Sequence, residues 1–187
     1  MKIIKSYFNN KVHIIQNEVH KDMRGFFTET YNIKKFEKIG INNKFKQDNF
    51  SFSKFKYTFR GIHLQKKPYA QAKLVRVVKG KIIDLIFDLR KNSKTFGEYR
   101  NILLSDSKSE MVYIPEDFGH GFLTLSNNTI VQYKVTNFYS PSHEITINYK
   151  DHDINLNMKE IKYKLIVSEK DLQGMSLDEY KIKTFKK

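Results

Sequence analysis

The sequence predicts an all-β fold, an antiparallel β-sandwich or jelly roll with short flanking helices. Apolar and polar residues alternate with a period of two in FKQDNFSFS, AKLVRVV and TIVQYKVTN, as expected for strands with one buried face. Turn signals rich in Gly, Pro, Asn and Ser separate such runs. No Gly-rich loop stands between a strand and a helix, so a Rossmann or P-loop fold has no support.

Each expected strand is a short run of apolar, aromatic or β-branched residues. In the first half of the chain these runs are Val12–Ile15, Phe26–Tyr31, Phe45–Ser53, Arg60–Gln65 and Ala72–Val78. In the second half they are Lys81–Leu89, Tyr99–Leu104, Met111–Ile114, Thr129–Asn137 and Glu144–Asn148. Helices are expected at Ile33–Ile39, which ends at Gly40, and around Ser176–Tyr180.

Length and composition exclude several classes of protein. The 187 residues fit a single domain over 1–187, and 40% hydrophobic residues supply a core. The chain has no cysteine, which excludes a disulfide framework, thiolate catalysis and a Cys-based zinc site. The best apolar run, Ile82–Leu89, is short and interrupted by Asp84 and Asp88, so no membrane span is expected. The N-terminus lacks the pattern of a signal peptide, and we expect a cytoplasmic protein.

The positive charge does not indicate nucleic-acid binding. The chain has 34 Lys and Arg against 20 Asp and Glu, a formal net charge of +14. Lys greatly outnumbers Arg, and the charges are scattered without a block of like charge. A lysine-rich surface explains this pattern, although a basic pocket for a diphosphate or another small anion also fits it.

Three regions place polar or ionisable residues in strands that otherwise appear buried. In the first, His63 and Gln65 share one strand face with Gly61. In the second, Lys73 opens an apolar run, and in the third, His120 stands at the head of a strand after a turn bounded by Pro and Gly. Each residue taken alone is also consistent with an ordinary core histidine or surface lysine.

The two histidines together resemble the paired motifs of the cupin superfamily. Metal-binding cupins use His-x-His, a following Glu and a later His as ligands. Here Gln65 replaces the second His and no Glu follows within five residues. Two imidazoles alone make a poor metal site, so we expect no metal and no other cofactor.

A closer resemblance covers about residues 12–172. The chain is identified as a member of the dTDP-4-dehydrorhamnose 3,5-epimerase family by motifs in one order with compatible spacings. They are DMRGFFTE from Asp22, Gln47-Asp48-Asn49, RGIHLQ from Arg60, Lys73-Leu74-Val75, Asp88-Leu89-Arg90, SKTFG from Ser93, IPEDFGHGF from Ile114, Tyr133-Lys134, Tyr139, Glu144 and SEKD from Ser168. The resemblance implies a cupin-type double-stranded β-helix.

The resemblance also implies a metal-independent epimerisation at C3 and C5 of a nucleoside-diphosphate 4-keto sugar. Such a reaction needs a base on one face of the sugar, an acid on the other, and a group that stabilises the enolate oxygen. The family pattern makes His63 the base, Asp171 its carboxylate partner and Tyr133 the acid. Histidine titrates near pH 6.5 and tyrosine near pH 10, which suits both roles at about neutral pH. Lys73 is expected to stabilise the enolate.

Further positions match substrate contacts of the family. Cationic, polar and aromatic groups for the diphosphate, the sugar and the base are expected at Arg24, Phe26, Glu29, Gln47, Asn49, Arg60, His120, Tyr139, Glu144 and Lys170. In the family the N-terminal strand crosses to a partner subunit. We therefore expect a homodimer in which Arg24, Phe26 and Glu29 act in the neighbouring site.

The resemblance leaves the substrate and some rival functions open. Departures from the family at Tyr57, at Leu64 and in segment 151–158 leave the nucleotide and sugar undecided, between a dTDP-linked deoxyhexose and a GDP-linked heptose for a surface polysaccharide. A single-carbon epimerase and a 3,4-ketoisomerase use the same fold. A non-catalytic sugar-nucleotide-binding cupin has no need of an acid–base pair, and an iron-dependent oxygenase lacks its ligand at Gln65.

Overall fold

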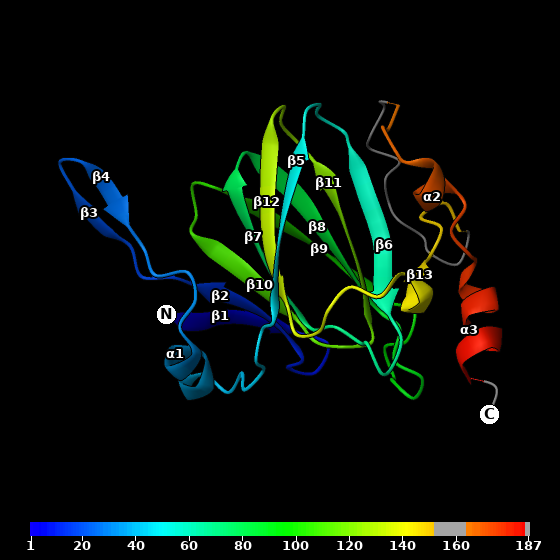
Figure 1. Cartoon of the computed structure of the whole chain (residues 1–187). Coiled ribbons are helices and arrows are strands. Elements are labelled where there is room, and N and C mark those ends of the chain that lie inside the picture. The colour runs from blue at the N-terminus through cyan, green and yellow to red at the C-terminus, as the bar shows by residue number, and fades with distance from the viewer. Residues whose placement is uncertain (152–163, 186–187) are drawn as a thin grey trace.

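Two antiparallel β-sheets pack face to face and form the body of the protein (Figure 1). The computed structural model describes residues 1–151 and 164–185. In spatial order, the six-stranded sheet contains β1 (Lys2–Tyr7), β2 (Val12–Gln16), β10 (Glu110–Ile114), β7 (Lys73–Lys79), β12 (Thr129–Val135) and β5 (Gln47–Ser53). The five-stranded sheet contains β13 (Glu144–Thr146), β6 (Phe59–Gln65), β11 (Phe118–Thr124), β8 (Lys81–Asp88) and β9 (Tyr99–Ser105). The predicted all-β jelly roll is confirmed.

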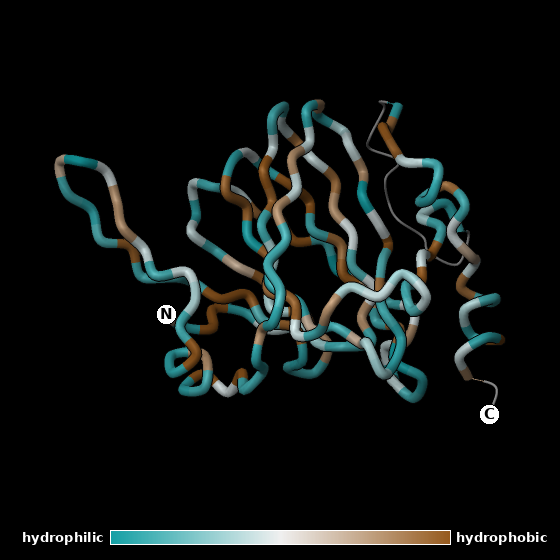
Figure 2. Tube along the Cα trace, viewed as in Figure 1, coloured by the Kyte–Doolittle hydropathy of each residue, from teal (hydrophilic) through white to brown (hydrophobic). Residues whose placement is uncertain are grey.

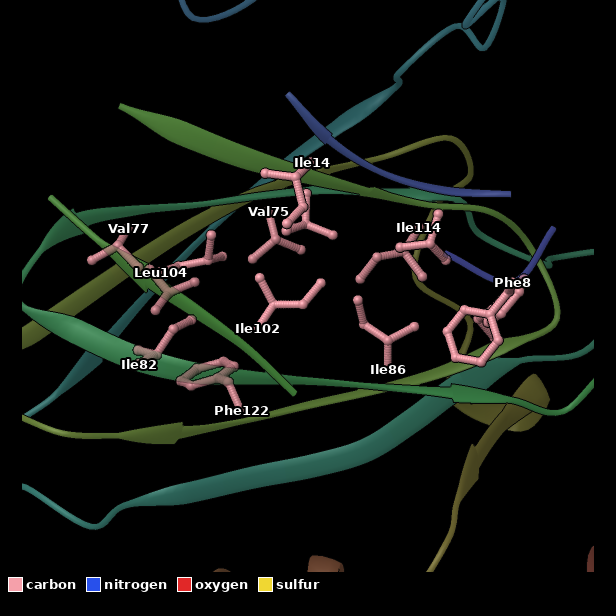
Figure 3. Packing of buried hydrophobic residues seen from close by; sticks show 14 residues of the cluster. Phe8, Ile14, Val75, Val77, Ile82, Ile86, Ile102, Leu104, Ile114 and Phe122 are labelled. Atoms are coloured by element: carbon pink, nitrogen blue, oxygen red, sulfur yellow. The ribbon is translucent and has the colours of Figure 1, made fainter. Parts of the chain in front are cut away.

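Strand alternation divides the space between the sheets into an apolar part and a polar part. On β7, Val75 and Val77 point into the apolar core, and the next inward-facing residue toward the start of the strand is Lys73. The apolar part contains side chains from both sheets (Figure 3), among them Ile14, Ile82, Ile86 and Ile102. The polar part is the pocket described below. The rigid core therefore fixes the strands on which the pocket residues stand.

The outer faces of both sheets are covered in part by helices. Helix α1 (Ile33–Lys38) buries Phe36 against a cluster on the six-stranded sheet. Helix α3 (Leu177–Phe185) buries Leu177 and Tyr180 against a cluster on the five-stranded sheet. Helix α2 (Glu169–Leu172) precedes α3 in the chain and contacts β6, and the one-turn 3-10 helix η1 (Pro141–His143) precedes β13.

The helices agree with expectation to different degrees. Helix α1 covers the expected range except its last residue, Ile39, which is the C-cap. Helix α3 starts one residue later than expected and continues five residues further. Helix α2 was not expected, because its single turn depends on the Ser168 side chain, which accepts a hydrogen bond from the backbone N–H of Asp171. No described helix is both long and apolar enough to cross a membrane.

The N-terminal region departs most from expectation. Strands β3 (His20–Asp22) and β4 (Gly25–Phe27) form a hairpin that projects away from the two sheets (Figure 1). The expected strand over Phe26–Tyr31 is therefore wrong beyond Phe27. Asn32 accepts hydrogen bonds from the backbone N–H groups of residues 34 and 35, so the chain must already turn into α1 there.

One strand was not expected from the sequence, and one segment singled out in the sequence lies outside the described residues. Strand β1 was not expected, because lysines interrupt its apolar pattern and none of its residues at this sheet edge is fully buried. Segment 151–158, where the chain departs from its family, lies outside the described residues after Asp151.

Candidate active site

A pocket of about 460 Å³ opens between the two sheets at the polar end of the core. Strands from both sheets and helix α2 contribute to its wall. The residues that line it are Gln47, Asn49, Ser51, Arg60, His63, Leu64, Gln65, Gln71, Lys73, His120, Phe122, Tyr133, Tyr139, Glu144, Ser168, Lys170 and Asp171.

His63 and Asp171 form an ion-pair geometry at one side of the pocket. The Nε2 atom of His63 lies 2.6 Å from Oδ1 of Asp171, and the backbone N–H of Gly61 donates to Oδ2 at 3.1 Å. Burial acts to raise the pKa of Asp171, but the hydrogen bonds from His63 and Gly61 outweigh it and hold the pKa below the usual value. An ionised carboxylate only accepts, so Nε2 carries the hydrogen and Nδ1 remains free to take a proton.

A close approach of two glycines sets the position of His63. On β6, Gly61 has a φ of +122°, and a Cβ there would lie 2.6 Å from Cα of Gly121 on β11. The two strands therefore come closer than side chains allow, with an irregularity in the ladder between His120 and Phe122. As a result, His63 and His120 lie opposite each other as cross-strand neighbours.

Lys73 is buried at the start of β7, with its ammonium group inside the pocket. Its Nζ donates a hydrogen bond to the carbonyl oxygen of His63 at 2.9 Å. Burial lowers the pKa of Lys73 to about 8, although the charges of Asp84 and Glu144 counteract this effect. The side chain is therefore mainly protonated at neutral pH and is a strong donor in a poorly hydrated place.

Tyr133 enters the pocket from β12, in the sheet opposite to that of His63. Burial raises the pKa of the Tyr133 phenol, although the charges of Arg60 and Lys170 act to lower it. The phenol therefore stays protonated at neutral pH and can donate a proton. Asn49 is its cross-strand neighbour on β5 and also lines the pocket.

A second histidine–carboxylate pair lies deeper in the same sheet. The Nε2 atom of His120 lies 2.7 Å from Oδ1 of Asp84 on β8. Both side chains are buried, at 7% and 0% exposure, whereas the His63 side chain is 30% exposed. His120 lines the pocket and Asp84 does not.

Charged and polar groups cluster on Glu144 near α2. Its Oε2 accepts hydrogen bonds from Nζ of Lys170 at 2.6 Å and from the hydroxyl of Tyr139 at 2.7 Å. Burial acts to raise the pKa of Glu144, but these two bonds hold it below its usual value. The ring of Tyr139 is half exposed and so is accessible to a planar ligand.

A further set of contacts holds the residues of β5 and β6. Nε2 of Gln47 donates to Oδ1 of Asn49 at 2.8 Å. Arg60 donates to Oγ of Ser53 and to the carbonyl oxygen of Phe52, which directs its guanidinium along β5. These bonds hold donors for an anionic ligand at the pocket wall.

Gln65 has a structural role at the position where metal-binding cupins have a histidine. Its Nε2 donates to the carbonyl oxygens of Tyr69 and Phe138, and its Oε1 accepts from the backbone N–H of Ser140. Among the described residues, no three His, Cys, Asp or Glu side chains converge in the manner of a metal site.

The structure brings together most of the residues that the sequence analysis selected. Eleven of them line the pocket: Gln47, Asn49, Arg60, His63, Lys73, His120, Tyr133, Tyr139, Glu144, Lys170 and Asp171. Arg24, Phe26 and Glu29 do not line it. Arg24 pairs with Asp22 on the projecting hairpin, and Glu29 pairs with Lys35.

The residues that the sequence analysis did not select include two informative polar ones, the partly buried Ser51 and the buried Asp84. Ser51 lines the pocket, and its Oγ has no hydrogen-bond partner among the residues that the structure describes. Its inward position on β5, two residues after Asn49, was the available signal. Asp84 was noted only as an interruption of an apolar run, although a carboxylate in a fully buried strand itself indicates a polar partner.

Comparison with known proteins gives one consistent result. The family model described as dTDP-4-dehydrorhamnose 3,5-epimerase matches residues 9–179. A dTDP-4-dehydrorhamnose 3,5-epimerase of Methanothermobacter thermautotrophicus is 43% identical over 95% of this chain and 95% of its own length. One from Escherichia coli is 40% identical over 96% of each chain.

Solved structures agree with the sequence relatives. The dTDP-4-dehydrorhamnose 3,5-epimerase of Bacillus anthracis, with TDP and PPi bound, superposes with a TM-score of 0.87 at 38% identity, covering 94% of this chain and 98% of that one. A Legionella pneumophila epimerase in complex with dTDP-4-keto-L-rhamnose has a TM-score of 0.83 at 34% identity, covering 92% and 91%.

Proposed function

The chain belongs to the dTDP-4-dehydrorhamnose 3,5-epimerase family, and from this membership we propose how its pocket carries out the reaction. The protein is an isomerase that inverts C3 and C5 of a dTDP-linked 4-keto sugar. The observation that carries the assignment of roles is the placement of His63 and Tyr133 on opposite sheets of one pocket. A sugar ring held between the sheets would present one face to each.

The first step is removal of a proton beside the C4 ketone. Nδ1 of His63 takes a proton from C3 or C5. The electron pair of the broken C–H bond forms a double bond to C4, and the C4 carbonyl electrons move onto its oxygen to give an enolate. His63 becomes an imidazolium ion, which the carboxylate of Asp171 at 2.6 Å stabilises. The ammonium group of Lys73 then stabilises the enolate oxygen.

The second step delivers a proton to the other face. The Tyr133 hydroxyl donates its proton to the enolate carbon, which inverts that centre and leaves a phenolate. Solvent then restores the proton of Tyr133 and removes the one held by His63. The raised pKa of Tyr133 favours the neutral phenol and so favours return to the starting state.

The remaining groups suit a nucleoside diphosphate. Arg60 and Lys170 supply positive charge for the diphosphate, and His120 supplies a ring nitrogen for the sugar. Gln47, Asn49 and Glu144 offer polar contacts, and the exposed ring of Tyr139 offers a stacking surface for the base. We therefore assign these residues to substrate binding.

The experiment that tests these roles is hydrogen exchange in D₂O with a dTDP-linked 4-keto-6-deoxyhexose. The wild-type enzyme should incorporate deuterium at both C3 and C5 and invert both. GDP- and CDP-linked 4-keto sugars, tested in parallel, show whether the nucleotide is selected. Exchange at a single carbon would identify a single-carbon epimerase, and a shift of the ketone to C3 would identify a ketoisomerase.

Tyr133→Phe separates the acid from the base. His63 can still remove and return a proton on its own face, so exchange should persist while inversion falls by about 10²-fold. Val131→Ala, a substitution in the apolar core on the same strand, controls for simple loss of packing. A wild-type rate of inversion in Tyr133→Phe would show that Tyr133 is not the acid.

We also propose a homodimer in which the β3–β4 hairpin completes the site of the partner. The hairpin projects from the body (Figures 1 and 2). Its Phe26 and Phe27 side chains are 65% and 69% exposed. Arg24, Phe26 and Glu29 do not line the pocket of their own chain. A second copy would cover the exposed rings and receive the charge of Arg24.

Mixed dimers test this exchange directly. Arg24→Ala and His63→Asn chains are each expected to be inactive alone. When coexpressed, random pairing should restore about a quarter of the wild-type activity, because one site of each mixed dimer then has an intact arm and an intact base. A mixture without activity, or a mass near 22.3 kDa by light scattering, would contradict the proposal.

We further propose that residues 1–187 act as one domain, since both sheets enclose one central core. We place the enzyme in the cytoplasm because its nucleoside-diphosphate substrate is built from cytoplasmic nucleotides. Fractionation of cells that express the protein tests this location.

A further inference from the structure

A buried carboxylate behind the pocket has no role in the steps above. Asp84 lies in the middle of β8, fully buried, between Ile82 and Ile86, which belong to the central apolar core. It does not line the pocket, so it does not contact a substrate there. A charged group in such surroundings is unfavourable unless other groups compensate its charge.

Only one of the two carboxylate oxygens of Asp84 accepts a hydrogen bond from the described residues. Oδ1 accepts from Nε2 of His120 at 2.7 Å. Oδ2 is buried and has no hydrogen-bond partner among the residues that the structure describes. The carboxylate is therefore held by one hydrogen bond among the described residues, and a positive charge nearby would help to balance it.

Lys73 is a buried cation on the opposite sheet, and it stands on the inward face of β7 as Asp84 stands on the inward face of β8. It is a buried ammonium group of the pocket, and among the described residues it donates to the carbonyl oxygen of His63, a neutral acceptor. Burial lowers the pKa of Lys73 to about 8, and Asp84 is the carboxylate that opposes this effect most, followed by Glu144. The charge of Asp84 therefore favours the protonated form of Lys73.

We propose that Asp84 is a positioning residue that acts through two pocket groups. Its Oδ1 fixes the imidazole of His120 with the Nε2 hydrogen pointing away from the substrate, which leaves Nδ1 for the pocket. Its charge keeps Lys73 protonated and thereby sets the upper pH limit of the reaction. The second effect rests on the proposed function, because it matters only if Lys73 stabilises the enolate.

Other charged groups also face the pocket and must be distinguished from Asp84. Tyr133 and Tyr139 stay neutral near pH 8 because both have raised pKa values. The groups that carry or change charge are Arg60, His63, His120, Glu144, Lys170 and Asp171. All six are retained when Asp84 alone is changed, so a difference between the two proteins reports on Asp84.

The test is Asp84→Asn, which keeps the shape of the side chain and removes its charge. Lys73 is observed through the ¹³Cε resonance, assigned by its absence in Lys73→Met, and titrated without substrate. Without the nearby opposite charge, the proton affinity of Lys73 should fall about tenfold. The alkaline limb of kcat should move to lower pH accordingly, so that kcat falls about eightfold at pH 8.5 and less than about twofold at pH 6.5.

Asp88→Asn is the matched control. Asp88 is a fully buried carboxylate on the same strand, but it binds Arg90, Ser93 and Thr95 outside the pocket. Its loss should lower thermal stability and leave both the Lys73 titration and the alkaline limb unchanged. A purely structural role of Asp84 would give the same pattern in Asp84→Asn, and that result would overturn the proposal.

A measurement on the wild-type protein covers the case in which Asp84→Asn does not fold. The ¹⁵N shifts of neutral His120 should show a protonated Nε2 and an unprotonated Nδ1, and the opposite tautomer would contradict the proposal. Failure of the proposed epimerase function can be distinguished from failure of the proposed role of Asp84. If Lys73 titrates as expected in both proteins but neither exchanges substrate hydrogen, the epimerase assignment fails and the role of Asp84 stands.

Discussion

The two histidine–carboxylate pairs share a chemistry but differ in their surroundings. His63 is partly exposed to the pocket, and its partner Asp171 also accepts a bond from the backbone of Gly61. His120 is buried, and its partner Asp84 has one oxygen without a hydrogen bond among the described residues. Both histidines present Nε2 to the carboxylate at nearly equal distances, 2.6 Å and 2.7 Å.

The comparison indicates that solvent access, more than the carboxylate partner, decides whether a histidine can exchange a proton during the reaction. A proton taken by His63 can leave to water, because the ring is accessible and its carboxylate is well supported. A proton on His120 has no such exit, so the buried pair is suited to holding a ring nitrogen in place. The predictions below compare the two pairs, from the largest expected effect to the smallest.

The largest effect is expected from His63→Asn. No other group on that face takes a proton, so kcat should fall by about 10⁴-fold and deuterium incorporation should stop at both C3 and C5. His120→Asn should instead raise KM by about tenfold and retain exchange, because it removes one binding contact. Exchange by His63→Asn at the wild-type rate would remove the distinction between the pairs.

Lys73→Met should have the next largest effect. The substitution retains the length of the side chain and removes its charge, so kcat should fall by about 10²–10³-fold with the fold intact. Lys79→Met, at the exposed end of the same strand, should have no effect on kcat. Wild-type activity should survive chelation by EDTA. The mechanism would be contradicted if EDTA inactivated the enzyme, iron restored its activity, and the Lys73→Met variant remained active.

The smallest effect concerns stability. Asp171→Asn should lower the free energy of unfolding by about 1.5–3 kcal/mol at pH 7, the range for hydrogen bonds to a charged group. Because the folded pKa of Asp171 lies below 3.8, this stabilisation is complete above pH 3.8 and is lost as the pH falls through the folded value. Urea unfolding should therefore show the difference between the two proteins disappearing in acid.

A control for that measurement is Asp178→Asn, which removes an exposed ion pair with Lys181. Such pairs contribute at most about 1 kcal/mol, so its unfolding should follow the wild type closely. If Asp171→Asn were as stable as the wild type at pH 7, the charge of Asp171 would not contribute to the free energy of unfolding through its pair with His63.

The sequence predicted the sheets and most of the pocket for different reasons. Alternation is a local property, so strands such as Phe45–Ser53 were expected almost to the residue. The partnership of His63 and Asp171 joins residues 108 positions apart, and only the family resemblance indicated it. The close contact of Gly61 with Gly121 has no local signal, because a glycine in a strand does not reveal what lies against it.

Other features escaped sequence reasoning because they depend on partners. The pattern of Asp84 within an apolar strand was visible, but its meaning requires knowing that His120 lies on the neighbouring strand and that Lys73 lies on the other sheet. The end of β4 at Phe27 has no local signal either, because Thr28, Thr30 and Tyr31 are residue types that also favour strands.

The placement of acid and base on separate sheets has a consequence for the response to heat. Within a sheet, hydrogen bonds fix the spacing of strands, but the two sheets are joined mainly by side-chain packing. The separation of His63 from Tyr133 therefore depends on the distance between the two sheets, which is the least constrained dimension of the fold. Thermal expansion across that direction would spoil proton delivery before any strand separates, so catalytic inactivation should precede the loss of secondary structure on heating.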